Sequence, residues 1–595
     1  AIRFPAPRAR RIAQCSAPAG RANRSGMKHR EPALAALFAT FEPLSAAEAR
    51  LLRELGDGAL IRFGDGRPRP REDPERTIRA AFLRTVIVHG AAALGLHEKG
   101  LQLAGAAIRG ALDLEGCRIG RNLGLLDCAF DAVMVLRGAV VDSVGLDGSG
   151  VPGLVADRLE ARGDLYLRGV AASGPVVLTG ARIGGELVAD GLEVTAGGEL
   201  ALDAERVKTA GSVLLRGAGL VGGLRLRGAD VGADIAMTGA KVARPEGVAV
   251  DGDGLAARGD VVLRLARVEG DVALVGARVG GDVDVSGGRF VAPDGAALSL
   301  VRAVVEGALI ARQGCRFEGA VNFNGARAGA LVDDPAAWPE PGALLLNHFA
   351  YDAILGGPAD AELRLRWLAL QNPGRWGEDF WPHPYEQLSA VLADMGHDDD
   401  AQRVLLEKER LQRRVRRQRV ASRPWRGLLA LKDGLLYVTI GFGRLPLLAF
   451  AWLFALWLVG TGVYGALAEH DAVRPNVPVV LRSPEWVLCG TEAPAALFVP
   501  SLGTERAGLA APGQSQLACY RAQPEAASFP PFNTWMYSLD VLLPAMEIGQ
   551  QTHWSPDVRK PWGSAGRGFL YLPVIMGWVL SLLAVAGFSG IVKTR

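Results

Sequence analysis

The chain has 595 residues and a formal net charge of +3 at pH 7, a length that excludes a single ordinary hydrophobic core. Residues 100–330 hold 24 basic and 28 acidic side chains, a balance too even for a rod that mimics DNA. Glycine is abundant at 76 residues and aromatic residues make up only 7%, which favours tight turns and small interiors over a helical bundle.

The first segment contains no predicted element. Residues 1–26 are rich in Arg, Ala, Gly and Pro and have no apolar core, so they do not form a secretory signal. We predict a disordered leader over residues 1–32 and expect the native start at Met27.

A helical N-terminal cap is expected over residues 33–97. Apolar residues recur with helical spacing in 33–55 and again in 75–95. Because a stacked repeat leaves bare strand edges at its ends, we expect these helices to cover the first coil.

The centre of the chain is a repeat. Gly163, Gly211, Gly259 and Gly307 recur with a 48-residue period, which contains a shorter 11-residue unit. The unit reads Gly, Ala, any, Ile or Val, any, Gly, any, apolar, any, apolar, any. Its short alternating segments can bury their apolar face only by stacking, which predicts a β-solenoid over residues 98–332, with about ten coils if one period makes two.

The second position of the unit is small, as expected for an inside corner. Ala106, Cys117, Cys128 and Ala139 occupy this position in successive units. We therefore interpret Cys117, Cys128 and Cys315 as small buried side chains and not as reactive thiols.

Motifs for catalysis are weak in this region. Asp260, Asp271 and Asp282 share the 11-residue spacing, which suggests either a carboxylate row for metal binding or sugar hydrolysis, or solvated turn residues, the interpretation that we favour. No histidine lies between His97 and His348, and Pro152 interrupts the dinucleotide-like glycines near residue 150. We predict no catalytic residue, no metal ligand and no cofactor.

Residues 333–426 are expected to form a helical hairpin followed by a basic segment. The hairpin helices are predicted over 384–396 and 399–419, with His383 and His397 as isolated structural residues beside them. The basic segment indicates either contact with anionic lipids or a nucleic-acid patch, and the adjacent apolar run favours lipid. Its predicted lipid-facing cluster is Arg410, Arg413, Arg414, Arg416, Arg417, Arg419, Arg423 and Arg426.

Two uncharged runs, 445–468 and 568–592, are each long enough to cross a bilayer as a helix. We predict an interfacial segment and first span over 427–468, an extracytoplasmic loop over 469–567, and a second span over 568–595. Because arginines precede the first span and basic residues end the chain, the positive-inside rule places both termini in the cytoplasm.

The loop between the spans contains two cysteines and an aromatic segment. Cys489 and Cys519 are its only cysteines, and an oxidising compartment makes a disulfide between them plausible. The segment that includes Trp535, Tyr537, Asp540 and Glu547 suits a helix in the outer interface, or alternatively a re-entrant pore helix between two spans.

Several stretches resemble a known group. They are the Gly-Ala-any-Ile-any-Gly units, the sequence Gly441-Phe442-Gly443-Arg444-Leu445-Pro446, and Tyr537-Ser538-Leu539-Asp540 with Leu543-Pro544 and Ile548-Gly549-Gln550. In these the chain, from about residue 80, resembles bacterial pentapeptide-repeat-like membrane proteins of uncharacterised role. Some of that group carry the label of membrane-associated oxidoreductase. An 11-residue unit departs from a five-residue repeat, and no residue set here supports redox chemistry.

The predicted fold class is mainly β: a β-solenoid rod with helical caps and a two-span α-helical membrane segment. We hypothesise a scaffold or interaction protein of the bacterial inner membrane that presents the solenoid in the cytoplasm. The alternatives are a two-span channel or gate with a pore segment near residues 533–549, and a membrane-associated oxidoreductase. Expected partners are membrane lipids, a protein on the solenoid surface and a second copy of the chain, but not nucleic acid.

Overall fold

The computed structural model describes residues 40–67, 73–445, 447–490, 497–499, 504–506, 510–543 and 546–588. The predicted leader and Met27 lie outside these residues. The chain divides into two compact units, the first ending at Ala401 and the second beginning at Gln402.

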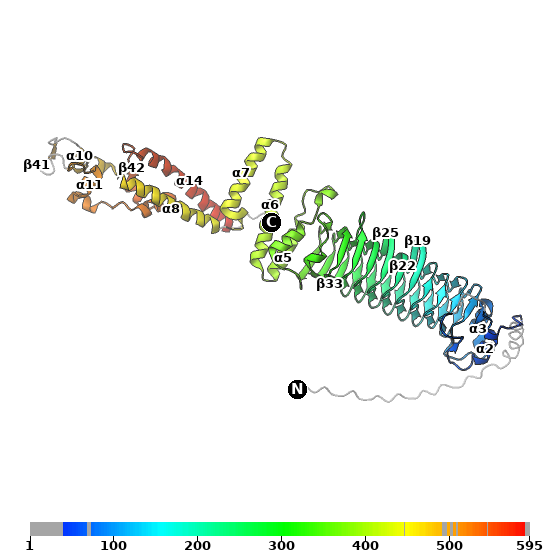
Figure 1. Cartoon of the computed structure of the whole chain (residues 1–595). Coiled ribbons are helices and arrows are strands. Elements are labelled where there is room, and N and C mark those ends of the chain that lie inside the picture. Colours follow the sequence, from blue (N-terminus) through cyan, green and yellow to red (C-terminus); the bar gives the residue numbers. More distant parts are fainter. Residues whose placement is uncertain are drawn as a thin grey trace, which may run out of the picture. The chain divides into compact units, whose positions relative to one another are not determined.

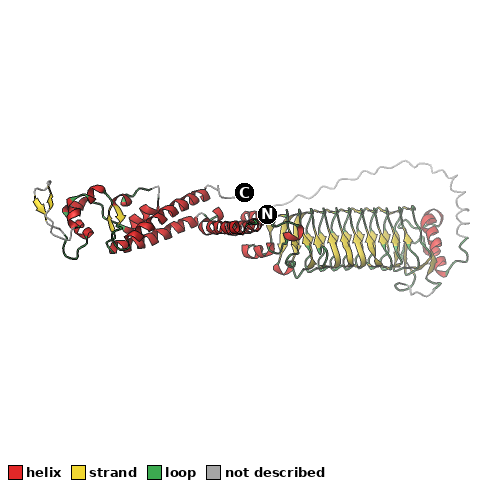
Figure 2. Ribbon diagram, turned by 90° about the horizontal axis from the view of Figure 1, so that it is seen from above, coloured by secondary structure: helices red, strands yellow, loops and turns green. Residues whose placement is uncertain are grey.

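The first unit is a parallel β-solenoid of about 11 turns, as predicted (Figures 1 and 2). One coil consists of β10 (Val144–Gly145), β11 (Gly150–Val151), β12 (Leu154–Val155) and β13 (Glu160–Ala161). The next coil begins with β14 (Leu165–Tyr166), which pairs in parallel with β10. Each coil therefore has four sides, which we call faces 1 to 4 in the order of these four strands.

The remaining strands stack on these faces. Those of face 1 are β1 (Ile61–Arg62), β3 (Leu101–Ala104), β6 (Leu123–Leu126), β18 (Leu187–Val188), β21 (Val213–Leu214), β24 (Ile235–Ala236), β27 (Val261–Val262) and β30 (Val283–Asp284). Those of face 2 are β2 (Thr77–Arg79), β4 (Ala107–Arg109), β7 (Ala129–Phe130), β15 (Ala171–Ala172), β31 (Arg289–Ala292) and β34 (Arg316–Gly319). Those of face 3 are β8 (Met134–Val135), β16 (Val176–Val177), β32 (Leu298–Ser299), β35 (Val321–Asn322) and β37 (Leu344–Leu345). Those of face 4 are β5 (Arg118–Ile119), β9 (Val140–Val141), β17 (Arg182–Ile183), β20 (Lys208–Thr209), β23 (Asp230–Val231), β26 (Ala256–Ala257) and β29 (Arg278–Val279).

Longer strands turn a corner between two faces. Faces 2 and 3 share β19 (Glu193–Asp203), β22 (Gly219–Arg225), β25 (Lys241–Asp251) and β28 (Arg267–Ala273), whereas faces 4 and 1 share β33 (Val304–Ala311), β36 (Arg327–Asp333) and β38 (Ala350–Ile354). The ladder thus runs from β1 to β38 and extends beyond the predicted range of 98–332 on both sides.

The 48-residue period consists of two unequal coils. The length of each coil follows from hydrogen bonds between equivalent positions of neighbouring coils. Asp260 N–H donates to Asp234, which is 26 residues earlier, and Asp282 N–H donates to Asp260, which is 22 residues earlier. The next bond, from Ala308 N–H to Asp282, again spans a separation of 26. The extra residues of the longer coils lie where strands such as β19 and β25 shift register on their way from face 2 to face 3. The additional residues in β19 and β25 are therefore insertions that recur in every second coil of this part of the solenoid.

The four period glycines occupy one edge of the solenoid. Gly211 N–H donates to Gly185 O at 2.8 Å, Gly259 N–H to Ala233 O at 3.0 Å, and Gly307 N–H to Gly281 O at 3.1 Å. Glycine is required because neighbouring coils meet closely here. A Cβ on Gly259 would lie 1.9 Å from Asp234 Oδ1.

The interior follows the repeat unit. The corner positions Ala106, Cys128, Ala139, Ala218, Ala229, Ala240, Ala266 and Ala277 are fully buried or nearly so. Val, Leu and Ile from successive coils stack above one another, so each coil buries the apolar face of its neighbour. Cys117 differs from the prediction, because its side chain is only half-buried.

The N-terminal cap consists of α2 (Ala46–Glu54) and α3 (Ala80–Ala93), within the segments predicted as helical. Ser45 and Glu48 form a capping box at the start of α2, which satisfies two backbone N–H groups of its first turn. Glu48 also accepts hydrogen bonds from the Arg79 side chain at 2.6 and 2.9 Å. This pair ties α2 to the residue that precedes α3.

The C-terminal cap consists of η1 (Pro335–Ala337), α4 (Ala361–Leu368), η2 (Pro373–Trp376) and α5 (His383–Asp394). Arg364 of α4 is fully buried and makes a bidentate ion pair with Asp333 at 2.7 and 2.9 Å. Trp338 Nε1 donates to the same carboxylate at 2.7 Å. The helix α5 packs on β38, where Gln387 donates to Tyr351 O.

The second unit is mainly helical. The helix α6 (Asp398–Gln418) begins in the first unit, and α5 and α6 match the predicted hairpin within one residue at three of their four ends. The long helices α8 (Leu447–Glu469) and α14 (Gly563–Phe588) correspond to the two uncharged runs. Both are long and apolar enough to cross a membrane. The helix α7 (Arg423–Ile440) and η3 (Gly441–Gly443) precede α8.

Short elements connect α8 to α14. They are β39 (Val473–Pro475), α9 (Pro478–Leu481), α10 (Pro484–Cys489), β40 (Leu497–Val499), β41 (Thr504–Arg506), α11 (Gln516–Arg521), η4 (Pro524–Ser528), α12 (Thr534–Leu542), α13 (Gln550–His553) and β42 (Trp554–Pro556). Antiparallel pairing of β39 with β42 joins the two ends of this segment.

Candidate functional site

A groove runs along face 2 of the solenoid. One hollow of about 550 Å³ is lined by Ala107, Ala129 and Ala171, and a second of about 560 Å³ by Gly219 and Lys241, among others. Glu193 and Thr195 line both hollows, so together they form one continuous groove. Its length across the coils suits an elongated ligand better than a compact one.

The groove floor follows one column of outward-facing residues in register. Its first half is small and uncharged: Ala107 pairs with Ala129, followed by Gly150 and Ala171. After Glu193 and Gly219 the column continues with Lys241, Arg267, Arg289 and Arg316, which we call the basic column. These four cations follow one another at the coil spacing of about 4.8 Å.

Outward charges on the other faces neutralise one another from coil to coil. On face 4, Arg182 pairs with Glu160 at 3.7 Å and Lys208 with Asp230 at 3.6 Å. On face 3, Arg225 lies 3.5 Å from Asp203. No acid interrupts the basic column, although Arg289 reaches Glu318 in the neighbouring column at 2.8 Å. Like charges at this spacing repel, so the column favours an anionic ligand.

Arg67 lies beside the small-residue floor of the groove, next to Gly150. Its Nε donates to Gly148 O at 2.8 Å, and its Nη2 reaches Gly169 O of the next coil at 3.4 Å. The guanidinium thus attaches the loop after β1 to the coil edges beside the small-residue floor.

The predicted row of Asp260, Asp271 and Asp282 does not exist. Eleven residues are half a coil, so Asp271 lies at the corner that leads into face 3, whereas Asp260 and Asp282 share the edge of face 1. Each carboxylate accepts a backbone N–H of the next coil: Asp260 that of Asp282 at 2.8 Å, and Asp271 that of Ala296 at 2.9 Å. The favoured interpretation as solvated turn residues is therefore also incomplete, because these acids join coils.

The buried thiols are unsuited to nucleophilic chemistry. Burial raises the pKa of Cys128 and that of Cys315 to about 12, so both stay protonated at neutral pH. His383 is not isolated as predicted, since its ring centroid lies 4.8 Å from that of His348. Burial and the neighbouring His348 lower the pKa of His383. Among the described residues, no group of three or more His, Cys, Asp or Glu side chains is placed to hold a metal ion.

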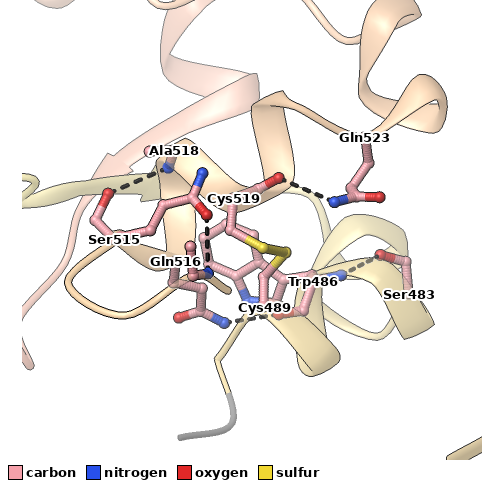
Figure 3. Close-up of a disulfide and its surroundings, with 10 residues drawn as sticks. Ser483, Trp486, Cys489, Ser515, Gln516, Ala518, Cys519 and Gln523 are labelled. Atoms are coloured by element: carbon pink, nitrogen blue, oxygen red, sulfur yellow. Dashed lines mark hydrogen bonds between the residues drawn. A yellow bond between two sulfur atoms is a disulfide. The ribbon is translucent and has the colours of Figure 1, made fainter. Parts of the chain in front are cut away.

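The predicted disulfide between Cys489 and Cys519 is present (Figure 3). It joins α10 to α11, with the two Cα atoms 5.6 Å apart. Gln516 Nε2 donates to Trp486 O at 2.8 Å beside it. Both cysteines belong to a buried cluster that also contains Tyr537 and Trp554, so the disulfide is part of the core of the segment that connects the two long helices.

The aromatic segment forms α12, which packs between α8 and α14. Ser538 Oγ donates to Trp457 O at 2.9 Å, and Trp457 Nε1 donates to Trp535 O at 3.0 Å. Trp457 lies near the midpoint of α8. Leu542, at the end of α12, forms a buried cluster with Leu453 and Leu580.

The chain then returns along α12. Asp540 accepts the backbone N–H of Ile548 at 2.8 Å and that of Gln551 at 2.7 Å, whereas the side chain of Glu547 is exposed. Tyr537 is buried against Tyr464 of α8, with ring centroids 4.7 Å apart. Of the four predicted residues, Tyr537 and Asp540 are thus packed inside the unit.

The predicted arginine cluster divides into two sets. Arg413 and Arg417 of α6 make ion pairs with the buried Asp433 of α7, at 3.2 and 2.5 Å. Arg414, Arg416, Arg419, Arg423 and Arg426 are exposed, and Arg410 pairs with Glu407 at the longer distance of 3.5 Å. Whether this cluster faces lipid stays a prediction.

The basic column was missed in the sequence because its members are unevenly spaced along the chain. No constant interval marks Lys241, Arg267, Arg289 and Arg316. Only the alternation of long and short coils brings them into one column. No protein-family model matches the chain, and neither the curated proteins nor the solved structures contain a match.

Proposed function

We propose that this protein is a membrane-anchored scaffold that binds a protein partner in the groove of face 2. The observation that carries the proposal is the continuous groove, with its small-residue floor at one end and its basic column at the other. In this proposal α8 and α14 span the bacterial inner membrane, and both termini with the solenoid lie in the cytoplasm.

The groove favours an extended polypeptide segment with acidic residues as the partner. The Ala and Gly floor leaves room for side chains of the ligand, and the four cations extend over about 14 Å, the length of four to five residues of extended chain. Carboxylates on such a segment would neutralise the repulsion within the basic column.

Site-specific photo-crosslinking in cells tests this function. A photoreactive amino acid at Ala171 in the groove should give a discrete adduct, and the double variant Lys241→Glu with Arg267→Glu should remove it. Ala256, which faces outward on face 4, is the matched control and should give no adduct. Equal adducts from Ala171 and Ala256, or an adduct insensitive to charge reversal, would contradict the proposal.

A second candidate function, an ion channel or gate, is favoured by the packing of α12. A helix that reaches the midpoint of α8 and then returns has the topology of a re-entrant segment, which is tolerated at membrane depth only against protein or water. The exposed Glu547 would then lie at the mouth of a pore.

Conductance across planar bilayers decides between the two functions. A channel predicts steady single-channel currents from the purified full-length chain, reduced in Glu547→Gln. The neutralising change Glu505→Gln, in the strand β41, is the control and should leave the currents unchanged. Silent bilayers with correctly inserted protein would leave the scaffold as the function.

A further inference from the structure

The helix α7 presents an apolar surface that no described residue covers. Five large apolar side chains recur at intervals of three or four residues along it, and each is at least half exposed. We call them the apolar stripe: Trp425 (61%), Leu428 (54%), Leu431 (71%), Leu435 (54%) and Val438 (50%). A stripe of this kind on a helix of 18 residues needs a partner.

The opposite side of α7 is already occupied. At 100° per residue, Leu431, Leu435 and Val438 lie roughly opposite Asp433. Asp433 is buried and paired with Arg413 and Arg417 of α6, and the Arg413 guanidinium also lies 4.6 Å from the centre of the Phe442 ring. The ion pairs fix the rotation of α7, so its apolar stripe points away from α6.

The direction of α7 determines how the apolar stripe is oriented with respect to the long apolar helices α8 and α14. Ile440 at its end packs with Ala449 of α8 and Ala584 of α14 in one buried cluster. From this junction α7 runs across the direction of α8 and α14 (Figure 1). If α8 and α14 cross a bilayer, a helix that crosses them at their ends lies along its surface.

Exposed cations of α7 flank the stripe. At 100° per residue Arg423 and Lys432 lie on either side of it, and both are exposed. No acid lies between Arg410 and Lys432 in the sequence. Phosphate groups of anionic lipids attract cations placed beside an interfacial helix.

We propose that α7 lies in the plane of the membrane, with its apolar stripe in the acyl boundary and the flanking cations against anionic lipid phosphates. This inference rests on the proposed membrane anchoring. The inference adds a lipid-binding surface to the proposed anchor, and the ion pairs of Asp433 fix the orientation of that surface. A bilayer fits better than a second copy of the chain, because the stripe continues directly into α8 and the cations that flank it would repel those of a second copy.

Depth-dependent fluorescence quenching tests the proposal on the full-length chain in nanodiscs. With every cysteine outside the disulfide replaced by Ala, a bimane label is placed at Leu431→Cys in the stripe or at Arg426→Cys on the polar side. We expect the Leu431→Cys label to be quenched by brominated acyl chains and protected from aqueous iodide. The Arg426→Cys label should show the reverse.

A third label separates this inference from the anchoring itself. Phe454 is exposed on α8, so a Phe454→Cys label must be quenched by brominated lipid if α8 spans the membrane. Quenching of Phe454→Cys without quenching of Leu431→Cys would overturn the inference alone. Protection of Leu431→Cys from both quenchers would overturn it in favour of a protein partner.

A second experiment varies the charge of the lipids. Including phosphatidylglycerol in the nanodiscs should shift the Leu431→Cys emission further to the blue, and the double variant Arg423→Glu with Lys432→Glu should remove this dependence. An emission that responds neither to the anionic lipid nor to the charge reversal would contradict the role of the cations.

Discussion

The two units of the chain are stabilised in different ways. In the solenoid, the same backbone hydrogen bonds and small corner residues recur in every coil, so each contact has many equivalents. In the second unit each contact occurs once, as in the disulfide, the Asp433 ion pairs and the carboxylate of Asp540. A repeat therefore spreads its stability along the chain, whereas the second unit depends on a few residues.

The largest loss of stability from a single substitution is expected at the C-terminal end of the solenoid, which would show that the repeat also depends on one contact. Asp333→Ala leaves the guanidinium of Arg364 buried and unpaired, which should cost about 3–5 kcal/mol of unfolding free energy. The measurement is denaturant unfolding of the full-length chain followed by tryptophan fluorescence. Arg366→Ala, on the exposed side of the same helix, is the control and should cost less than about 0.5 kcal/mol. A loss from Asp333→Ala as small as that of the control would contradict the role of the buried pair.

Removal of the disulfide should affect the second unit alone. The double variant Cys489→Ser with Cys519→Ser frees a loop of 30 residues, which should cost about 3 kcal/mol. Thermal unfolding in detergent, combined with limited proteolysis of the two units, measures the change. Cys128→Ala, within the solenoid, should leave the transition of the second unit in place. Equal proteolysis of both units in the double variant would show that the two do not unfold separately.

A substitution at a single corner of the solenoid should give a smaller loss of unfolding free energy. Gly259→Ala places a Cβ against Asp234 Oδ1 and the Ala233 backbone, and the resulting strain should cost about 1–3 kcal/mol. Gly120→Ala is the matched control, because nothing lies within 4 Å of its Cβ position. Chemical unfolding of the two variants side by side should separate them. Identical midpoints would mean that the glycine edge is not closely packed.

A substitution in the N-terminal cap should lower the unfolding free energy by an amount that depends on pH. Burial alone would raise the pKa of Glu48, but hydrogen bonds from Arg79 and Ser45 outweigh this and lower it from its ordinary value of 4.5. Its stabilising effect is therefore complete above pH 4.5 and disappears as the pH falls further. Glu48→Gln should cost about 1–2 kcal/mol at pH 7 and less below pH 4.5, measured by unfolding at both pH values. A loss that is equal at both would exclude the carboxylate charge as its source.

Much of the solenoid could be predicted from the sequence, because the repeat itself is the signal. The spacing of Gly163, Gly211, Gly259 and Gly307 specified one edge and the small residues specified the corners. The 48-residue period does not reveal which coils are long and which are short. For that reason Asp271 was grouped with the wrong acids and the basic column was not recognised.

In the second unit the sequence predicted elements but not contacts. The two long apolar helices and the disulfide partners follow from composition, because hydrophobic length and cysteine number limit the options. The ion pairs of Asp433 and the return of the chain at Asp540 depend on tertiary packing, which no local pattern encodes. The interfacial segment was predicted to begin at residue 427, although the helix α7 begins at Arg423 and extends over 18 residues.

The alternation of shorter and longer coils has a consequence for how such a chain changes length. Deleting one complete pair of coils would rejoin strands of matching register and shorten the molecule by about 10 Å. Deleting a single coil between β18 and β33 would put an insertion beside the wrong neighbour. The natural increment of growth or loss in this part is thus the doublet, whereas the coils before β18 are of nearly equal length and could be lost one at a time.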